Sequence, residues 1–509
     1  MNWKYFFAGC IFWAMGAFAI YAVRPNAALS RETVETASRR NHFAVGMIAL
    51  VIAGTVLLCT LPMSLCPIWN GANPEHRNQY EILTESILDG RIDLDYGDMD
   101  PRLPELDNPY DPDARAGIFY HWDHAFYNGK YYMYFGVVPV FLVFLPFRIV
   151  TGTTLTTYHA TQVFVAFIIL GVFALFFLLS RKFFRKMTLS AYLSLSAAAS
   201  IMSVWYFAEA PAMYCTAISA GVCMEIWSLF FFVKAVWGSD SERQSTCMGM
   251  LGSLFGALAF GCRPTVALAN ILAIPIFVQY LKKKQFNLKL LWKQILAVFA
   301  PYIVIGLLLM AYNYARFENP FEFGQSYQLT VADQSGYKNL LAQFGWTKVI
   351  NGLLNNFVAY IPLSDSFPYI ALQSVLFNAP IYLIAVFCLL QKDTLSALRD
   401  NKLLGLTGVL FFLPMLITVL QILQAPFLTE RYRTDIYWLI GILVFLSFGH
   451  FLESLGDGSR RICGFVVSLL AFATIFHCFI LWTVPNDANY TAMFPERLAM
   501  IEKILRLGF

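Results

Sequence analysis

Charged side chains are scarce in this chain. Of its 509 residues, only 13% are Asp, Glu, Lys or Arg, whereas 58% are hydrophobic and 17% are aromatic. Soluble domains carry about a quarter charged residues, and a mean hydropathy of +0.58 is unsuited to a surface that faces water. This composition argues against a cytosolic enzyme, a disordered chain, a repeat solenoid and a nucleic-acid binder, and it indicates a membrane protein.

Paired cysteines and a strong net charge are also missing. The ten cysteines form no CxxC motif and no Cys/His pair at zinc spacing, and nearly all of them, such as Cys215 and Cys388, lie inside apolar runs. We interpret them as packing residues. The net charge of +4, from 36 basic and 32 acidic side chains, is too slight to indicate a polyanionic partner such as nucleic acid.

Long apolar runs recur along the whole chain. A membrane-spanning helix needs about 20 mostly apolar residues. Runs of this kind, two of them shorter and flanking Arg263, occupy 5–23, 43–66, 157–180, 188–207, 212–235, 247–262, 265–281, 295–313, 372–391, 403–424, 435–453 and 462–483. The sequence therefore predicts an all-α polytopic protein of about 12 transmembrane helices, with residues 1–509 in a single multi-span membrane domain.

The orientation follows from lysine and arginine, which gather in five short loops at 24–40, 181–186, 282–293, 392–402 and 460–461. Cytoplasmic loops are enriched in these residues, so all five are expected inside. This requires that the apolar stretch at 134–156, which contains Pro139 and Pro146, is an interfacial or re-entrant helix. We expect a multi-pass cell-membrane protein with outer loops at 67–133 and 314–371, an outer amphipathic tail at 484–509, and its active site on the extracytoplasmic side.

The first outer loop is unusually acidic. From Glu75 to Lys130 it carries thirteen acidic and five basic residues, a net charge of −8 that packing of a membrane domain does not require. A solvated loop is the simplest interpretation. No motif demands a cofactor, and the alternative left open is a divalent metal held by the acidic string IDLDYGDMD at 92–100, because hard cations bind several carboxylates.

One string in this loop combines charged and aromatic groups directly before the interfacial stretch. Residues 120–141 read YHWDHAFYNGKYYMYFGVVPVF. A carboxylate beside aromatic rings at the membrane edge could act as a general base on a hydroxyl, which makes Asp123 our first candidate, ahead of Asp111 and Glu75. The alternative for Asp123 is a helix cap. The neighbouring residues expected to line the substrate site are His124, Tyr127, Lys130 and Tyr131.

The string HWDH offers a second hypothesis. His121, Asp123 and His124 could share a helix face and bind a metal ion. The outer loops supply no further histidine except the isolated His76, so we favour histidines that form hydrogen bonds.

Several cationic groups are expected at the outer face. They are Lys130, Arg263, Arg316, Arg431 and Arg433, the last two in ERYRTD at 430–435, where Glu430 is also expected to belong to the substrate site. The planar guanidinium group matches phosphate oxygens in two-point contact, so their convergence predicts an anionic ligand. The alternative pairs each arginine with a nearby carboxylate, such as Glu430 or Glu318.

These strings resemble a known class of enzyme. NPYD at 108–111, WDHAFYNGKYYMYFG at 122–136, RPT at 263–265, RFENPFEFGQSYQL at 316–329 and ERYRTD look like those of a bacterial branch of the GT-C class of integral-membrane glycosyltransferases. That class includes protein mannosyltransferases and lipid A aminoarabinose transferases. The large first outer loop and the proline-bearing interfacial segment that follows it add to the resemblance.

The resemblance implies transfer of a sugar, with inversion, from a polyprenyl-phosphate donor to a glycan, lipid or protein acceptor at the outer face. A first-loop carboxylate would be the base, and cationic residues would stabilise the departing phosphate. Many members place that acid shortly before the helix that matches YEILTESILDG at 80–90, where only Glu75 is present in this chain.

Two alternative functions use similar lipid-linked substrates. An O-antigen-type polymerase or ligase also uses outer arginines, but it has its large loop late in the chain. A transporter or flippase of lipid-linked saccharides should carry several charges within its spans. Glu225 is the only acidic group deep inside an expected span, and its neighbours Thr216, Ser219 and Ser228 could satisfy it.

Overall fold

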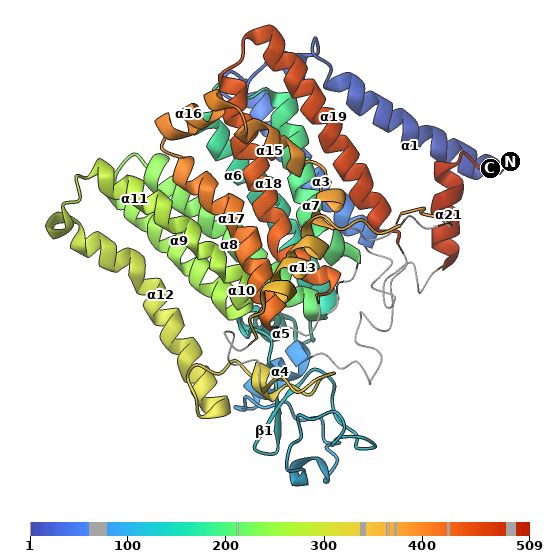
Figure 1. Cartoon of the computed structure of the whole chain (residues 1–509), viewed down its shortest axis with the longest axis vertical. Helices are drawn as coiled ribbons and strands as arrows, with labels where there is room; N and C mark the ends of the chain where they lie inside the picture. Colours follow the sequence, from blue (N-terminus) through green and yellow to red (C-terminus); the bar gives the residue numbers. More distant parts are fainter. Residues whose placement is uncertain are drawn as a thin grey trace.

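The chain folds into a bundle of long apolar helices with an irregular outer domain at one end (Figure 1). The computed structural model describes residues 2–60, 79–209, 211, 213–335, 343–362, 365, 367–370, 374–424, 428–484 and 495–509. Eleven helices within these residues are long and apolar enough to cross a membrane. They are α1 (Trp3–Ala22), α3 (Arg39–Thr60), α6 (Thr157–Phe183), α7 (Leu189–Glu209), α8 (Met213–Trp237), α9 (Glu242–Cys262), the continuous run of α10 (Pro264–Ala267), η5 (Leu268–Leu272) and α11 (Ala273–Lys283), α12 (Leu288–Phe317), α17 (Leu404–Gln424), α18 (Glu430–Glu453) and α19 (Asp457–Leu481). The expectation of an all-α polytopic membrane protein is confirmed.

The centre of the bundle is formed by α6, α7, α8 and α18. In α18, 94% of the most apolar window is buried, against 6% in α1 and α12, which lie at the periphery. Small residues allow the central helices to approach closely. A Cβ atom on Gly441 of α18 would lie 2.9 Å from the Cβ atom of Ala199 on α7, so α7 and α18 pack almost backbone to backbone.

The basic loops gather at the end of the bundle opposite the outer domain. The Lys186 ammonium group donates to the carbonyl of Glu453 at 2.7 Å, and the backbone amide of Val34 donates to Met187 at 2.9 Å. In Figure 1, α16 (Lys392–Asp400) lies at the upper left of the bundle, and the turn between α11 and α12 lies at its left edge. The enrichment of positive charge predicts that this end faces the cytoplasm.

One expected span is not a continuous helix. The run at 372–391 contains two short helices, α14 (Val375–Asn378) and α15 (Tyr382–Leu389). Pro380 causes the break, because proline disfavours helical geometry at the residue before it, and Ala379 has φ −127° and ψ 65°. The prediction of a twelfth transmembrane helix here was wrong in this respect, since eight residues cannot cross a bilayer.

The outer domain is built mostly from residues 79–156. It contains α4 (Gln79–Leu88), the short helix η3 (Leu103–Glu105) and an antiparallel hairpin of β1 (Ala125–Tyr127) and β2 (Lys130–Tyr132). Asn128 and Gly129 connect the strands with φ values of 47° and 71°, the geometry of a tight hairpin turn that favours Asn-Gly. A segment of the second outer loop joins the hairpin through a bridge between Ala125 and Gln328, directly after η6 (Gln325–Tyr327).

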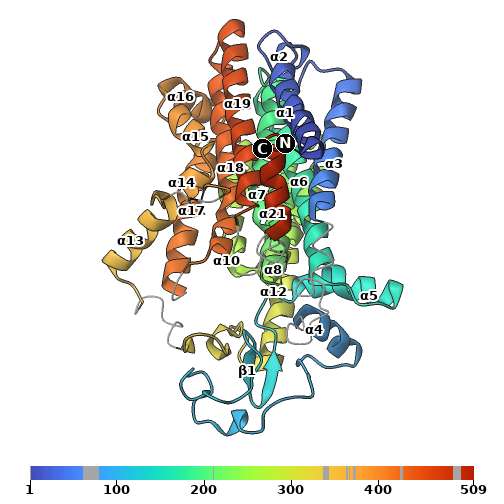
Figure 2. The same cartoon turned by 90° about the vertical axis from the view of Figure 1, so that its right-hand side faces the viewer.

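The apolar stretch at 134–156 forms short helices and does not make a span. A π-helical segment, η4 (Val140–Phe144), continues into α5 (Leu145–Thr151), which projects sideways from the bundle in Figure 2. Phe141, Ile149 and Val150 are exposed on it, as expected of a segment that rests in the membrane interface. Arg148 holds α5 against α4 with two hydrogen bonds to Glu85, at 2.7 and 3.2 Å.

The remaining helices complete the periphery. α2 (Ala28–Arg31) lies in the first basic loop, and α13 (Trp346–Phe357) lies in the second outer loop. In the expected amphipathic tail, α21 (Pro495–Leu505) packs on α1, where the indole nitrogen of Trp13 donates to the carbonyl of Leu505 at 3.2 Å. The two ends of the chain therefore lie side by side (Figures 1 and 2).

Candidate functional site

Asp123 is buried where the outer domain meets the ends of the spans. Its side chain is anchored from two distant parts of the chain: Gln328 donates to Oδ1 at 2.9 Å, and the hydroxyl of Tyr214, at the start of α8, donates to Oδ2. Its backbone has φ 56°, a conformation that Asp tolerates better than most residues. The amide nitrogen of Gln79 on α4 also donates to its carbonyl at 2.7 Å. The carboxylate is therefore held in one position.

His124 supports this position as a neutral side chain. Burial lowers its pKa to about 3. Its Nε2 lies 2.6 Å from the hydroxyl of Tyr96, and its Nδ1 lies 2.8 Å from the carbonyl of Trp122. His121 instead contacts Asp98 at 2.7 Å. Residues 121–124 form a turn and not a helix, so the spacing on which the HWDH metal hypothesis depended is absent.

Arg431 lies one aromatic ring away from Asp123. The residue is in the first turn of α18, and its guanidinium carbon lies 4.2 Å from the centre of the Tyr214 ring and 5.6 Å from that of Tyr432. Among the described residues, no carboxylate forms an ion pair with Arg431. Burial raises the pKa of Tyr134 well above its ordinary value, and the nearby charge of Asp123 adds to the shift. The carboxylate, the guanidinium group and three tyrosines thus form one cluster.

Arg263 also lies close to the ring of Tyr432. Its guanidinium carbon lies 5.4 Å from the centre of that ring. Its Nε donates to both oxygens of Asp435, at 2.9 and 3.0 Å, and Thr265 and Gln421 donate to the same carboxylate at 3.0 and 2.6 Å. No bond of its two terminal nitrogens joins it to another residue in the described part of the chain. Arg263 is therefore fixed through Nε, and within the described residues its terminal nitrogens are free to bind a ligand.

Together these contacts define what we call the ladder: Arg263, Tyr432, Arg431, Tyr214 and Asp123. It alternates cations and aromatic rings and ends in a carboxylate. An anion held near the two arginines would lie on the same side of the membrane domain as the carboxylate. Such an arrangement suits a reaction in which an anionic group departs while a neighbouring hydroxyl loses a proton.

Glu430 and Arg433 form a separate buried network. Arg433 forms an ion pair with Glu430 and donates from Nε to Asn356 at 2.9 Å. Asn378 and Tyr437 each donate to Glu430 at 3.2 Å. This network connects α18 to α13 and α14. The alternative in which an arginine pairs with a nearby carboxylate therefore holds for Arg433, and also for Arg263, whose partner is Asp435.

Arg316, although expected to bind an anion, packs inside the outer domain. It donates to the carbonyl of Met133 and, at 2.7 Å, to Asn313, and it stacks on Tyr312 and Phe317 at 4.1 and 4.5 Å. It is 4% exposed. This arginine fastens the end of α12 to the residue that follows β2.

The other expected substrate residues lie around the hairpin. Lys130 is exposed, with its nearest carboxylate, Asp93, at 3.6 Å. The Tyr127 hydroxyl donates to Glu318 at 3.4 Å, while Tyr131 is buried against His121 and His124. Within the described residues, no hydrogen bond, ion pair or ring contact joins Lys130, Tyr127 or Tyr131 to the ladder.

The two lower-ranked candidate bases are placed differently. Asp111 lies nearer the surface of the outer domain, where its Oδ1 accepts a hydrogen bond from the backbone amide of Asp113 at 3.0 Å. No contact joins it to the ladder among the described residues. Glu75 lies outside the described residues.

The carboxylates of the acidic string at 92–100 contact three basic side chains: Arg91, Arg102 and His121. Asp93 and Asp95 lie within 3.7 and 3.0 Å of Arg91, and Asp98 contacts His121. Hydrogen bonds from Arg102 hold the pKa of Asp100 well below its usual range. Across the described parts of the chain, no group of three or more His, Cys, Asp or Glu side chains is placed to hold a metal ion.

Sequence reasoning missed the neutral members of the site. Tyr214 and Gln328 carry no charge, and only their contacts with Asp123 identify them. It also passed over Glu81 on α4, whose pKa is raised to about 7 by burial. A pKa near neutrality is often found at functional sites. The carboxylate of Glu81 accepts a hydrogen bond from the backbone of Thr157 at the start of α6, so we do not assign it to the site around Asp123.

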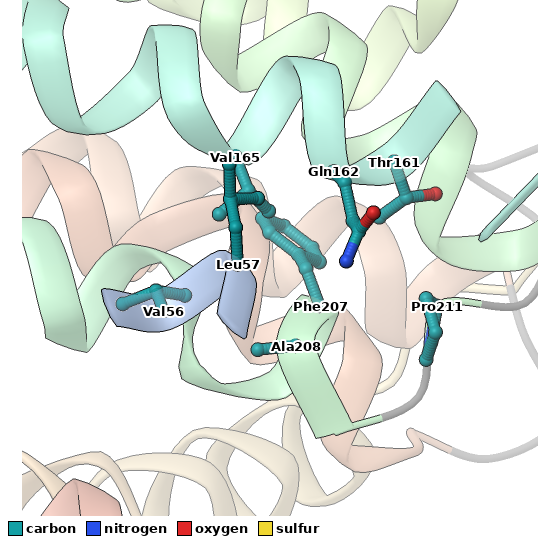
Figure 3. Close-up of a pocket in the computed structure, with 8 residues that line it drawn as sticks. All are labelled: Val56, Leu57, Thr161, Gln162, Val165, Phe207, Ala208 and Pro211. Atoms are coloured by element: carbon teal, nitrogen blue, oxygen red, sulfur yellow. The ribbon is translucent and has the colours of Figure 1, made fainter. Parts of the chain in front are cut away.

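Two cavities lie between the spans. A small one of 10 Å³, lined by Val56, Leu57, Thr161, Gln162, Val165, Phe207, Ala208 and Pro211, has room for about one water molecule (Figure 3). A larger groove of 390 Å³ is lined by apolar residues of α17, Gly405, Gly408, Val409, Phe412, Leu413 and Leu416, and by Ile271 of η5. Further along α17, Gln421 donates a hydrogen bond to Asp435, the partner of Arg263. The same helix therefore lines the groove and contacts the ladder.

The chain matches no protein-family model, no curated protein and no solved structure.

Proposed function

We propose that this protein is a membrane glycosyltransferase that transfers a sugar from a polyprenyl-phosphate-linked donor to an acceptor, with Asp123 as the general base. The observation that carries the proposal is the ladder. A buried and fixed carboxylate lies one tyrosine ring away from Arg431, which has no carboxylate partner among the described residues.

The proposed reaction is a single displacement. Asp123 accepts the proton of an acceptor hydroxyl, and the hydroxyl oxygen bonds to the anomeric carbon of the donor sugar. The bond from that carbon to the phosphate oxygen breaks, its electron pair leaves with the polyprenyl phosphate, and the configuration inverts. Arg431 and the terminal nitrogens of Arg263 stabilise the phosphate, because paired guanidinium groups suit its oxygens.

The lipid part of the donor also has a candidate site. The apolar groove along α17 is lined only by carbon-rich side chains and glycines, as a prenyl chain would require. The interfacial segment at 140–151, with its exposed Phe141, Ile149 and Val150, would hold the outer domain at the membrane surface. The interfacial segment supports a reaction at the outer face, whereas the groove, which begins at Gly405 near the basic end of α17, supports only the lipid-linked nature of the substrate.

The two alternative functions find less support. A transporter or flippase depends on Glu225, whose Oε1 accepts a hydrogen bond from Asn270 at 2.7 Å. Asn270 also donates to the carbonyls of Gly256 and Ala267, so Glu225 belongs to a packed contact between helices. An O-antigen-type polymerase or ligase would use the same arginines, and the nature of its acceptor separates it from our proposal.

The test uses the full chain reconstituted in lipid vesicles with a panel of radiolabelled polyprenyl-phosphate hexoses and pentoses. A membrane extract supplies glycan, lipid and protein acceptors, and the readouts are free polyprenyl phosphate and the labelled product. We expect the wild type to cleave at least one donor. Asp123→Asn should lower the rate by about 100- to 10,000-fold, the usual contribution of a general base.

Asp113→Asn is the matched control, because it removes an exposed carboxylate of the same loop, and we expect it to match the wild type. Full activity in Asp123→Asn would move the role of base to Asp111 or Glu75. Cleavage of no donor by the wild type would contradict a transferase. Movement of labelled lipid across the vesicle membrane without bond cleavage would identify a transporter.

A further inference from the structure

Tyr214 is the only ladder residue that touches both the carboxylate and the nearer cation. Its hydroxyl donates to Oδ2 of Asp123, and its ring lies beneath the guanidinium group of Arg431 at 4.2 Å. Phe135 packs edge-on against the same ring at 5.5 Å. Tyr214 is half-buried at the outer end of α8, so the central bundle determines where its ring lies.

The two ends of this side chain do different work. A hydroxyl that donates to one carboxylate oxygen keeps that oxygen in place, while Gln328 holds the other at 2.9 Å. The carboxylate then keeps its remaining lone pairs for a substrate proton. The ring face attracts the guanidinium group and limits its directions, because a cation is stabilised over an aromatic face.

Because of these two contacts, Asp123 and Arg431 each have a neutral partner in Tyr214. Arginine and aspartate side chains that meet directly form an ion pair, as Arg263 and Asp435 do at 2.9 Å. In such a pair, Asp123 would be less able to accept a proton and Arg431 less able to bind an anion. Tyr214 contacts both groups instead, with its hydroxyl on the Asp123 carboxylate and its ring on the Arg431 guanidinium group.

We propose that Tyr214 is a positioning residue with two separable roles: its hydroxyl orients Asp123 for proton transfer, and its ring orients Arg431 for the donor phosphate. This inference rests on the proposed function, and it predicts that kcat and the donor KM respond to different atoms of one side chain.

Two substitutions separate these roles. Tyr214→Phe keeps the ring and removes the hydroxyl, so kcat should fall by about 10- to 100-fold, the usual effect of losing a hydrogen bond to a charged group, while the donor KM stays within about twofold. Tyr214→Leu removes both, so kcat should fall similarly and the donor KM should also rise by about 5- to 30-fold. The donor is the polyprenyl-phosphate sugar that the wild type cleaves fastest in the panel above.

Tyr192→Phe is the matched control. It removes a buried hydroxyl that donates to Phe173 at 2.9 Å on a part of α7 away from the ladder, and it should leave kcat and KM unchanged. Thermal unfolding of each variant in detergent shows whether it is folded.

The outcomes distinguish this inference from the proposed function. If Asp123→Asn is inactive while Tyr214→Phe matches the wild type, the hydroxyl has no positioning role and the inference is wrong, although the transferase stands. If Tyr214→Phe and Tyr214→Leu have the same effect on kcat and the same effect on the donor KM, the hydroxyl and the ring have no separable roles and Tyr214 has only a structural role. If Asp123→Asn keeps full activity, the assignment of the base fails first.

Discussion

Two regions of the outer side contain carboxylates and cations in different arrangements. At the tip of the first outer loop, residues 89–105, acids and bases meet directly in water: Arg91 lies 3.0 Å from Asp95, and Arg102 lies 2.6 Å from Asp100. At the junction with the spans, the charges are fewer and partly or fully buried: Arg263 pairs with the buried Asp435, whereas Asp123 and Arg431 both contact the side chain of Tyr214. The tip has more charged residues. The junction has charged groups that are still able to bind a ligand, namely Asp123, Arg431 and the terminal nitrogens of Arg263.

The difference shows that charge density alone does not locate chemistry. An exposed pair is screened by water and contributes little free energy, so its members can change with small effect. A buried charge must be satisfied by a specific group, so each contact at the junction determines a position. The acid of interest is Asp123, because its hydrogen-bond partners Tyr214 and Gln328 are neutral.

The largest expected effect on stability is at the buried ion pair of the junction. Arg263→Ala leaves the carboxylate of Asp435, which is fully buried, with only Thr265 and Gln421 as donors. Loss of one partner of a buried pair costs about 3–5 kcal/mol, so the midpoint of thermal unfolding in detergent should fall clearly. Donor use should weaken as well, because the terminal nitrogens of Arg263 belong to the proposed phosphate site.

The paired variant Arg263→Met with Asp435→Leu separates these two effects. Removing both charges should restore much of the stability, because the uncompensated carboxylate is gone, while donor use stays weak. An unchanged unfolding midpoint in Arg263→Ala alone would show that the junction tolerates charge changes as the tip does.

A second effect concerns pH and His124. Burial lowers the pKa of this imidazole to about 3, whereas the unfolded chain has the ordinary value of 6.5. Below pH 6.5 the unfolded state takes up a proton that the folded state refuses, so stability is lost as the pH falls from 6.5 towards 3. By pH 5 the loss is about 2 kcal/mol.

His124→Gln tests this contribution directly. The variant has no imidazole to protonate, so its unfolding midpoint should decline less between pH 7 and pH 5 than that of the wild type. The measurement is thermal unfolding of both proteins in the same detergent at the two values. Parallel declines would mean that His124 is accessible to protons in the folded protein.

The fold was largely predictable because the bilayer imposes a length and a composition on each span. Where that rule failed, at 372–391, a single residue was responsible: Pro380 divides an apolar run of sufficient length into two short helices. Hydropathy averages over such a run and does not register the break.

The site was predictable only in its charged members. Asp123, Arg263 and Arg431 stand out because ionised groups are rare near apolar segments. Tyr214 and Gln328 are neutral, and they reach Asp123 across 91 and 205 residues of sequence. No local pattern encodes such contacts. The acidic string at 92–100 suggested a metal site because its carboxylates are close together in the sequence. In the fold they contact Arg91, His121 and Arg102 instead.

The smallest expected effect is at the tip. Arg91→Gln removes a guanidinium group that lies within 4 Å of Asp89, Asp93 and Asp95, with about 40% of its side chain exposed. Because exposed pairs of this kind contribute less than about 1 kcal/mol, the unfolding midpoint should barely move, and the remaining difference should vanish in high salt. A decrease as large as that of Arg263→Ala, measured in the same detergent, would mean that the tip carboxylates depend on Arg91 as strictly as Asp435 depends on Arg263. The acidic loop would then be a specifically held structure, and the contrast between the two regions would be lost.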